Sequence, residues 1–111
     1  PKLNKENTRI DWSQPLDKID SKIRGLSSYP GAWTELVSKE KSIVLKIFSA
    51  SVEFSNKKSN PKNILLLSDE IIITHYEGVL VCREIQMANK KRMTSKEIIN
   101  GKLLKPFFLV K

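Results

Sequence analysis

The chain offers few side chains that could carry out a reaction. His75 is its one histidine and Cys82 its one cysteine, whereas a structural zinc site takes four ligands, so we expect no metal. A catalytic nucleophile needs a base beside it, and His75 has no convincing Ser or Asp neighbour in the sequence. The four glycines are spread from Gly25 to Gly101 and form no glycine-rich phosphate loop. We therefore expect no catalytic residue in this chain.

A surplus of positive charge is the clearest chemical signal. The 111 residues carry 20 Lys and Arg against 12 Asp and Glu, a net charge of +8. Seven of the basic residues fall between Asn89 and Lys111, where Glu97 is the one acid. This balance favours polyanionic partners, RNA first and acidic membrane surfaces second, with a lysine-rich solvated surface as the alternative. The apolar runs are too short to span a bilayer, so we expect no membrane partner.

The positions of these charges suggest a phosphate-binding loop. Lys90, Lys91 and Arg92 are consecutive and lie between a predicted strand and a predicted helix, where a loop can contact a partner. Arg24 is a further candidate, although Asp20, four residues before it, can pair with it on a helix. Trp33 could stack on a base, but we expect it in the core. The candidate RNA-binding residues are Arg24, Lys90, Lys91, Arg92, Lys96, Lys102 and Lys105.

An amphipathic helix is predicted before the strands. An apolar stripe with helical spacing runs from Leu16 to Leu26. Ser13 can cap this helix, and Gly25 can end it. Trp12, just before the helix, is expected to anchor the N-terminal segment to the domain.

Alternating and β-branched segments then predict about five strands. Two of them are apolar on successive residues, as in a closed barrel or a sandwich, and the second strand has room for a bulge. Thr94 and Glu97 form a capping box that opens a short helix, and the apolar tail after Gly101 is expected to fold back as a strand. We expect a mainly β fold: a small closed β-barrel of the oligonucleotide-binding type with one N-terminal helix and one short C-terminal helix. The predicted strands are 32–37, 42–54, 62–68, 70–76 and 78–87.

Two well-separated groups of residues resemble one known family. The segments Arg9–Trp12 ("RIDW"), Ile23–Leu26 ("IRGL") and Pro30–Trp33 ("PGAW") resemble the start of the C-terminal domain of methionyl-tRNA formyltransferase. The stretch from Gly78 to Gly101, with its "KKRM", resembles the end of that domain. Tyr29 stands where the family usually has Trp. The resemblance covers nearly all of the chain and keeps the order of the motifs.

The resemblance implies a division of labour between two domains. The barrel would follow a Rossmann-like catalytic domain that uses 10-formyltetrahydrofolate, so this chain would hold no cofactor itself. Its partners would be the initiator tRNA and that catalytic domain. Residues 1–12 would be a linker from the catalytic domain and residues 13–111 the barrel. Because the chain starts with Pro1, we expect a fragment or a processed form, acting in the cytoplasm or, in a eukaryote, in an organelle.

A second interpretation uses the same motifs. Sugar-nucleotide formyltransferases and formyltetrahydrofolate dehydrogenases carry similar domains. The chain could then be a scaffold or dimerisation domain with no RNA binding. The apolar tail "LLKPFFLV" (103–110) is the feature that motivates this alternative.

Overall fold

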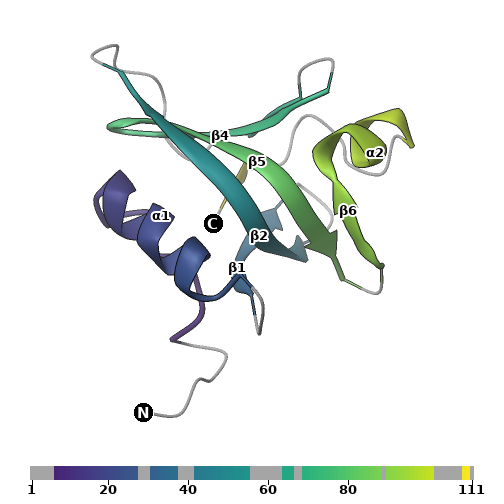
Figure 1. The fold of residues 1–111 in the computed structure, drawn as a ribbon, viewed down its shortest axis with the longest axis horizontal. Coiled ribbons are helices and arrows are strands. Elements are labelled where there is room, and N and C mark those ends of the chain that lie inside the picture. Colours follow the sequence, from purple (N-terminus) through teal and green to yellow (C-terminus); the bar gives the residue numbers. More distant parts are fainter. Residues whose placement is uncertain are drawn as a thin grey trace.

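The computed structural model describes residues 7–27, 31–37, 42–55, 64–66, 69–88, 90–101 and 109–110. A helix comes first, strands follow, and a short second helix precedes the last strand (Figure 1). The elements are α1 (Leu16–Gly25), β1 (Ala32–Val37), β2 (Ser42–Phe54), β3 (Ile64–Leu66), β4 (Ile71–His75), β5 (Gly78–Met87), β6 (Arg92–Thr94), α2 (Ser95–Asn100) and β7 (Leu109–Val110).

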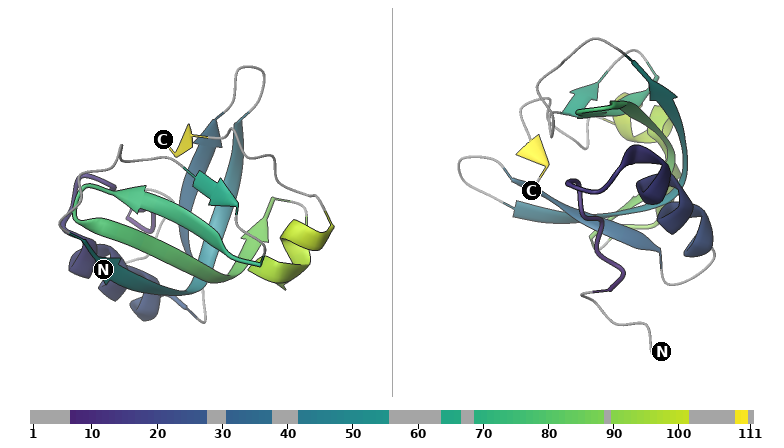
Figure 2. Two further views of the ribbon diagram at one scale, coloured as in Figure 1. Left: turned by 90° about the horizontal axis from the view of Figure 1, so that it is seen from above. Right: turned by 90° about the vertical axis from the view of Figure 1, so that its left-hand side faces the viewer.

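The strands form one antiparallel sheet in the order β3-β4-β5-β2-β1-β7, with β6 also paired to β5. The sheet curls into a half-barrel, and the right-hand view of Figure 2 shows β4 and β1 on opposite sides of the curl. Within the described residues, the edge strands β3 and β7 are not paired with each other. The predicted mainly β, barrel-like fold with two helices is confirmed. Strand β6 was not predicted.

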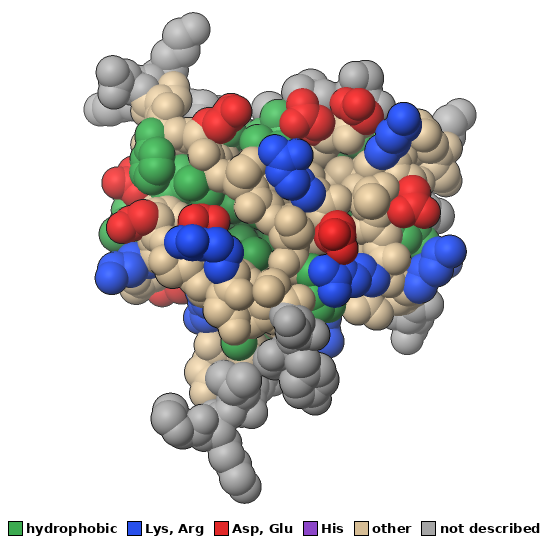
Figure 3. Space-filling view, in the orientation of Figure 1, with side chains coloured by type: hydrophobic (Ala, Val, Ile, Leu, Met, Phe, Trp, Pro, Cys, Tyr) green, Lys and Arg blue, Asp and Glu red, His purple; other side chains and the backbone are tan. Residues whose placement is uncertain are grey.

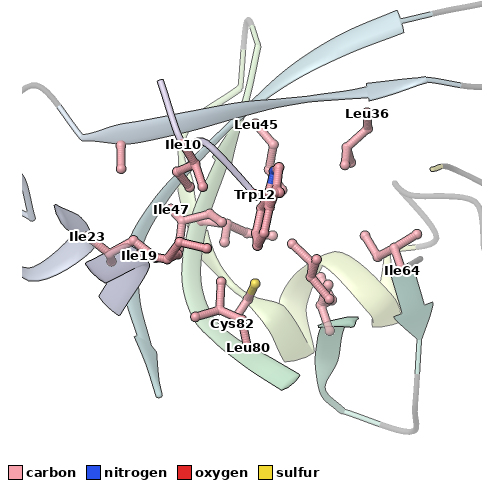
Figure 4. Close-up of a cluster of buried hydrophobic side chains, with 14 of the residues drawn as sticks. Ile10, Trp12, Ile19, Ile23, Leu36, Leu45, Ile47, Ile64, Leu80 and Cys82 are labelled. Atoms are coloured by element: carbon pink, nitrogen blue, oxygen red, sulfur yellow. The ribbon is translucent and has the colours of Figure 1, made fainter. Parts of the chain in front are cut away.

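The core fills the inside of the curl. Leu45, Ile47 and Leu80 are fully buried there, and burying each such side chain stabilises the fold by about 2 kcal/mol. Helix α1 adds its predicted apolar stripe to the same cluster. The Trp12 side chain points into the cluster (Figure 4), and its Nε1 donates a hydrogen bond to Thr34 Oγ1 at 2.8 Å. Trp12 therefore anchors the N-terminal segment, as predicted.

Strand β2 contains the predicted bulge. Its register against β5 shifts between Ile47 and Ser49, so Phe48 has no partner residue on β5. An unpaired residue bends the strand and strengthens its twist. Phe48 is nevertheless buried: Gly31 packs closely against its ring, and the guanidinium of Arg92 lies over the ring at 4.4 Å from the centroid.

The start of α1 differs from the prediction. Pro15 occupies the N-cap position, and no side chain within the helix start supplies a cap. Glu77, in the turn between β4 and β5, instead accepts a hydrogen bond from the Leu16 backbone N–H at 2.6 Å. Ser13 bonds to Asp11. The prediction that Ser13 caps α1 was wrong because a residue 61 positions away supplies the acceptor.

His75 joins the same turn to the segment before α1. Its Nδ1 accepts a hydrogen bond from the Glu77 backbone N–H at 3.0 Å. The neutral ring then carries its proton on Nε2, which donates to the Gln14 carbonyl oxygen at 2.8 Å. His75 is buried in β4, so it is a strand residue, as expected.

Candidate nucleic-acid interface

The predicted basic loop begins as a tight turn. Lys90 N donates to the Met87 carbonyl oxygen at 3.0 Å, and Gln86 Nε2 donates to the Lys90 carbonyl oxygen at 2.8 Å. The backbone of the turn is therefore held in place while the Lys90 and Lys91 side chains are exposed. These two residues lie in a loop after β5, as predicted, but the loop leads into β6 and not directly into a helix.

Arg92 does not lie in that loop. It begins β6, opposite Gln86 of β5. Its Nε donates to Glu84 Oε2 at 2.8 Å, and both side chains are 44% exposed. The expectation of a loop residue was wrong because backbone pairing with β5 continues the sheet through Arg92. Its guanidinium is held between the Glu84 carboxylate and the Phe48 ring.

Helix α2 carries the next cation. Its capping box is formed as predicted, with Thr94 and Glu97 bonded to each other. The hydrogen bonds from Thr94 lower the pKa of Glu97, and the positive charge of Lys91 lowers it further. Lys96 is exposed on α2. The structure thus places Lys90 and Lys91 directly before β6 and Lys96 just after it, at the edge of the sheet that β6 forms, and we call these three residues the lysine cluster.

The remaining candidates do not join this group. Arg24 lies on α1, which is at the opposite end of the molecule from α2 (Figure 1). Its Nε lies 3.3 Å from Asp20 Oδ2, so the predicted helical ion pair is present. Lys102 and Lys105 lie outside the described residues.

The sheet register reveals an alignment of residues that the sequence did not indicate. Trp33 of β1 is paired with Lys46 of β2, Lys46 with Gln86 of β5, and Gln86 with Arg92 of β6. Residues directly opposite each other point to the same face of a sheet. Arg9 continues the line through a bridge to Trp33. We call these five residues the outer row, because they lie on the face away from the core.

Arg9 and Trp33 are packed together at one end of the outer row. The Arg9 guanidinium lies over the Trp33 ring at 5.1 Å from its centroid and 3.9 Å from Glu35 Oε1. Backbone hydrogen bonds from Trp33 N to Thr8 O and from Ile10 N to Trp33 O hold this segment along β1. Trp33 is only 9% exposed, so it is buried as expected, but it packs against Arg9 and is not part of the main core cluster. Its ring therefore offers no open face to a base.

A hollow of about 230 Å³ adjoins the middle of the outer row. Lys46 lines it and is half-buried in the sheet surface. Alternation in β2 indicates that Lys46 faces outward between the buried Leu45 and Ile47. The line from Trp33 to Arg92 was not readable from the sequence, because it depends on which strands lie side by side in the sheet. The lining residues are Val44, Lys46, Gln86, Met87 and Ala88.

The charges on this part of the surface are mixed. In Figure 3, Lys and Arg side chains alternate with Asp and Glu over the visible face. Within the outer row, Arg92 is paired with Glu84 and Arg9 with Glu35. Exposed pairs contribute little to stability, about 0–1 kcal/mol each. Their main effect is to fix where the guanidinium groups lie.

The groups that could react are held inside the fold. Cys82 is 1% exposed, and burial raises the pKa of its thiol to about 12, which disfavours the reactive thiolate. His75 uses both ring nitrogens in hydrogen bonds. In the part of the chain that the structure describes, no three His, Cys, Asp or Glu side chains are grouped as metal ligands, and no helix is long and apolar enough to cross a membrane.

Curated relatives share the sequence over most of this chain. A methionyl-tRNA formyltransferase of Flavobacterium johnsoniae is 37% identical over 100 residues, which are 90% of this chain and 32% of that protein. The Parabacteroides distasonis enzyme is 38% identical over 91% of this chain. The Bacteroides fragilis enzyme is 34% identical over the whole chain and 35% of its own length. The chain thus spans about a third of the curated relatives it matches.

Solved structures show the same fold. A variant of HypX from Aquifex aeolicus superimposes with a TM-score of 0.69 and 22% identity, over 93% of this chain and 18% of that one. At this identity the likeness concerns the fold alone. The family model described as "Formyl transferase, C-terminal domain" matches residues 2–103. The chain therefore belongs to the formyl transferase C-terminal domain family.

Proposed function

We propose that this chain is the C-terminal domain of a methionyl-tRNA formyltransferase and helps to bind and orient the initiator methionyl-tRNA. The match of residues 2–103, together with relatives that are methionyl-tRNA formyltransferases, carries the proposal. Formylation takes place in a separate domain that binds 10-formyltetrahydrofolate. This chain itself holds neither cofactor nor metal, and it acts in the cytoplasm or, in a eukaryote, in an organelle.

Charge and exposure support this role. The chain has a net charge of +8, and the lysine cluster is exposed at the end of a rigid sheet. Contacts to phosphates fix the register and orientation of a nucleic acid without reading its sequence. Binding energy from such a remote surface can position the reacting end of a substrate at an active site elsewhere.

The proposal is tested with a labelled initiator tRNA transcript. Fluorescence anisotropy over a salt series should show weak binding whose logarithm falls with the logarithm of salt at a slope of roughly −4, as expected for about five phosphate contacts. The triple variant Lys90→Gln, Lys91→Gln, Lys96→Gln should bind more weakly. Failure to detect tRNA binding at low salt would contradict the proposed function.

One observation favours a second candidate, a scaffold or dimerisation domain of another formyltransferase without RNA binding. Phe54 is 60% exposed and Tyr76 is 50% exposed, and both lie near the turn between β4 and β5. Exposed aromatic side chains are enriched at protein interfaces. A tight dimer in sedimentation experiments, together with no tRNA binding, would support this candidate over the first.

A further inference from the structure

We propose that the outer row, formed by Arg9, Trp33, Lys46, Gln86 and Arg92, is a surface on which the RNA backbone lies across the strands. The inference rests on the proposed tRNA binding and assigns that binding to a face of the sheet. It adds Lys46 and Arg9 to the candidate RNA-binding residues that were predicted from the sequence. The lysine cluster then extends this surface at its β6 end.

The spacing of the row suits a chain of phosphates. Neighbouring strands lie about 4.8 Å apart, so Lys46 and Arg92, which are two strands apart, have backbones roughly 10 Å from each other. On the side of Lys46 away from Arg92, the row continues to Trp33 and then to Arg9. Three cations are thus spread across the sheet on a rigid base, and Gln86 supplies an amide between two of them.

The two arginines are oriented before any partner arrives. Arg92 donates to Glu84 through Nε and stays 44% exposed. Arg9 rests on Trp33 and stays 40% exposed. A guanidinium has five N–H donors in a fixed fork, so one carboxylate contact leaves donors for a phosphate. Holding the fork in place reduces the conformational entropy that binding must remove.

The ends of the row favour a backbone ligand over stacked bases. The Trp33 ring is covered by Arg9, so no aromatic face is open there for stacking. At the other end, Gln86 Nε2 bonds to the Lys90 carbonyl oxygen, which places the exposed Lys90 beside the row. The hollow next to Lys46 gives this surface a concave middle. Cations around a shallow concavity fit a phosphate chain.

A matched pair of double variants tests the row. Lys46→Gln with Arg92→Gln removes two cations of the row. Lys18→Gln with Arg83→Gln removes the same charges from α1 and from a position on β5 that lies outside the row. With the initiator tRNA transcript, we expect the first pair to lose roughly tenfold in affinity at low salt and to flatten the salt slope by about 2. The second pair should keep the slope of the parent protein.

The outcomes separate the row from the proposed function. Equal losses in both pairs would overturn the row, while tRNA binding itself would stand. No binding by the parent protein would overturn the proposed function, and the row with it. Circular dichroism confirms that each variant is folded.

A third variant gives a gain rather than a loss. Glu84→Gln keeps an oxygen that can hold Arg92 and removes a negative charge beside the expected phosphate. We expect this variant to bind the transcript several-fold more tightly. Unchanged or weaker binding would show that Arg92 is not a contact and would overturn the proposal.

Discussion

The turn between β4 and β5 and the basic end of the sheet use their polar groups in opposite ways. In the turn, Glu77 and His75 are bonded to backbone groups at the start of α1, and His75 is 2% exposed. At the basic end, the lysine cluster lies exposed on a turn and a short helix. The polar groups of the first region serve the fold, and those of the second are open to a partner.

This difference predicts different consequences of mutation. A polar group removed from the turn leaves a backbone donor or acceptor without its partner, and such losses are expensive in partly buried places. A lysine removed from the basic end leaves nothing unsatisfied within the fold. Changes in the first region should therefore lower the free energy of unfolding, and changes in the second should lower RNA affinity.

The largest expected effect is that of Gly78→Ala. A Cβ at Gly78 would overlap the backbone oxygen of Glu53, which belongs to the paired β2 strand and cannot move without breaking the sheet. We expect a loss of about 3 kcal/mol in the free energy of unfolding, measured by urea denaturation. Gly25→Ala is the control: nothing lies within 4 Å of its added Cβ, so stability should stay equal or rise. Equal effects of the two changes would contradict the tight approach at Gly78.

Next comes Glu77→Ala, which removes the acceptor at the start of α1. We expect a loss of about 2 kcal/mol, at the upper end for a helix cap. Glu77→Gln keeps an acceptor oxygen and should lose less than half of that. Chemical denaturation of the parent protein, of Glu77→Ala and of Glu77→Gln measures these differences in the free energy of unfolding. Two variants of equal stability would mean that the hydrogen bond to Leu16 contributes nothing.

A smaller effect is expected at the basic end from Thr94→Ala. This change removes the cap of α2 and its reciprocal bonds with Glu97, for a loss of about 1 kcal/mol. Thr94→Ser keeps the hydroxyl and should be close to the parent protein in thermal unfolding. If Thr94→Ala were as damaging as Glu77→Ala, the proposed contrast between the regions would fail.

The pH dependence of the stability of α2 should be a smaller effect than that of Thr94→Ala. Glu97 has a lowered pKa because Thr94 donates hydrogen bonds to its carboxylate. A depressed pKa in the folded state means that this contribution is present above the ordinary range of a glutamate and is lost as pH falls through the lowered value. NMR signals of α2 should therefore change in acid before the sheet unfolds. Signals of α2 and β5 that change together would refute this order.

The smallest effect on stability is expected from Lys90→Gln, Lys91→Gln and Lys96→Gln combined. These exposed side chains should change the free energy of unfolding by less than about 0.5 kcal/mol. The same variant should lose affinity for the initiator tRNA transcript. Thermal unfolding and fluorescence anisotropy, measured on the same preparation, give the stability and the RNA affinity. If the triple variant were destabilised, the three lysines would contribute to the stability of the fold and would not serve only to bind RNA.

Local patterns in the sequence predicted the local features. The apolar stripe of α1, the ion pair of Arg24 with Asp20, and the capping box at Thr94 all involve residues close in sequence. Each depends on the geometry of a single helix. These predictions needed no knowledge of which strands pair.

The features that were missed depend on distant partners. Glu77 caps α1 from 61 residues away, and Ser13 gave a misleading local signal. The outer row appears only when the register of β1, β2, β5 and β6 is known. Arg92 is a different case, because its partner Gln86 is close in sequence. Arg92 was expected in a loop because the three residues of β6 are too few to show alternation.

The anchoring of Trp12 has a mechanical consequence. Its ring lies in the core and is bonded to Thr34, while Ile10 and Trp33 are joined through their backbones. A force applied at Asn7 would therefore act directly on these bonds and on the packing of the Trp12 ring. Residues 8–12 would consequently move together with the barrel.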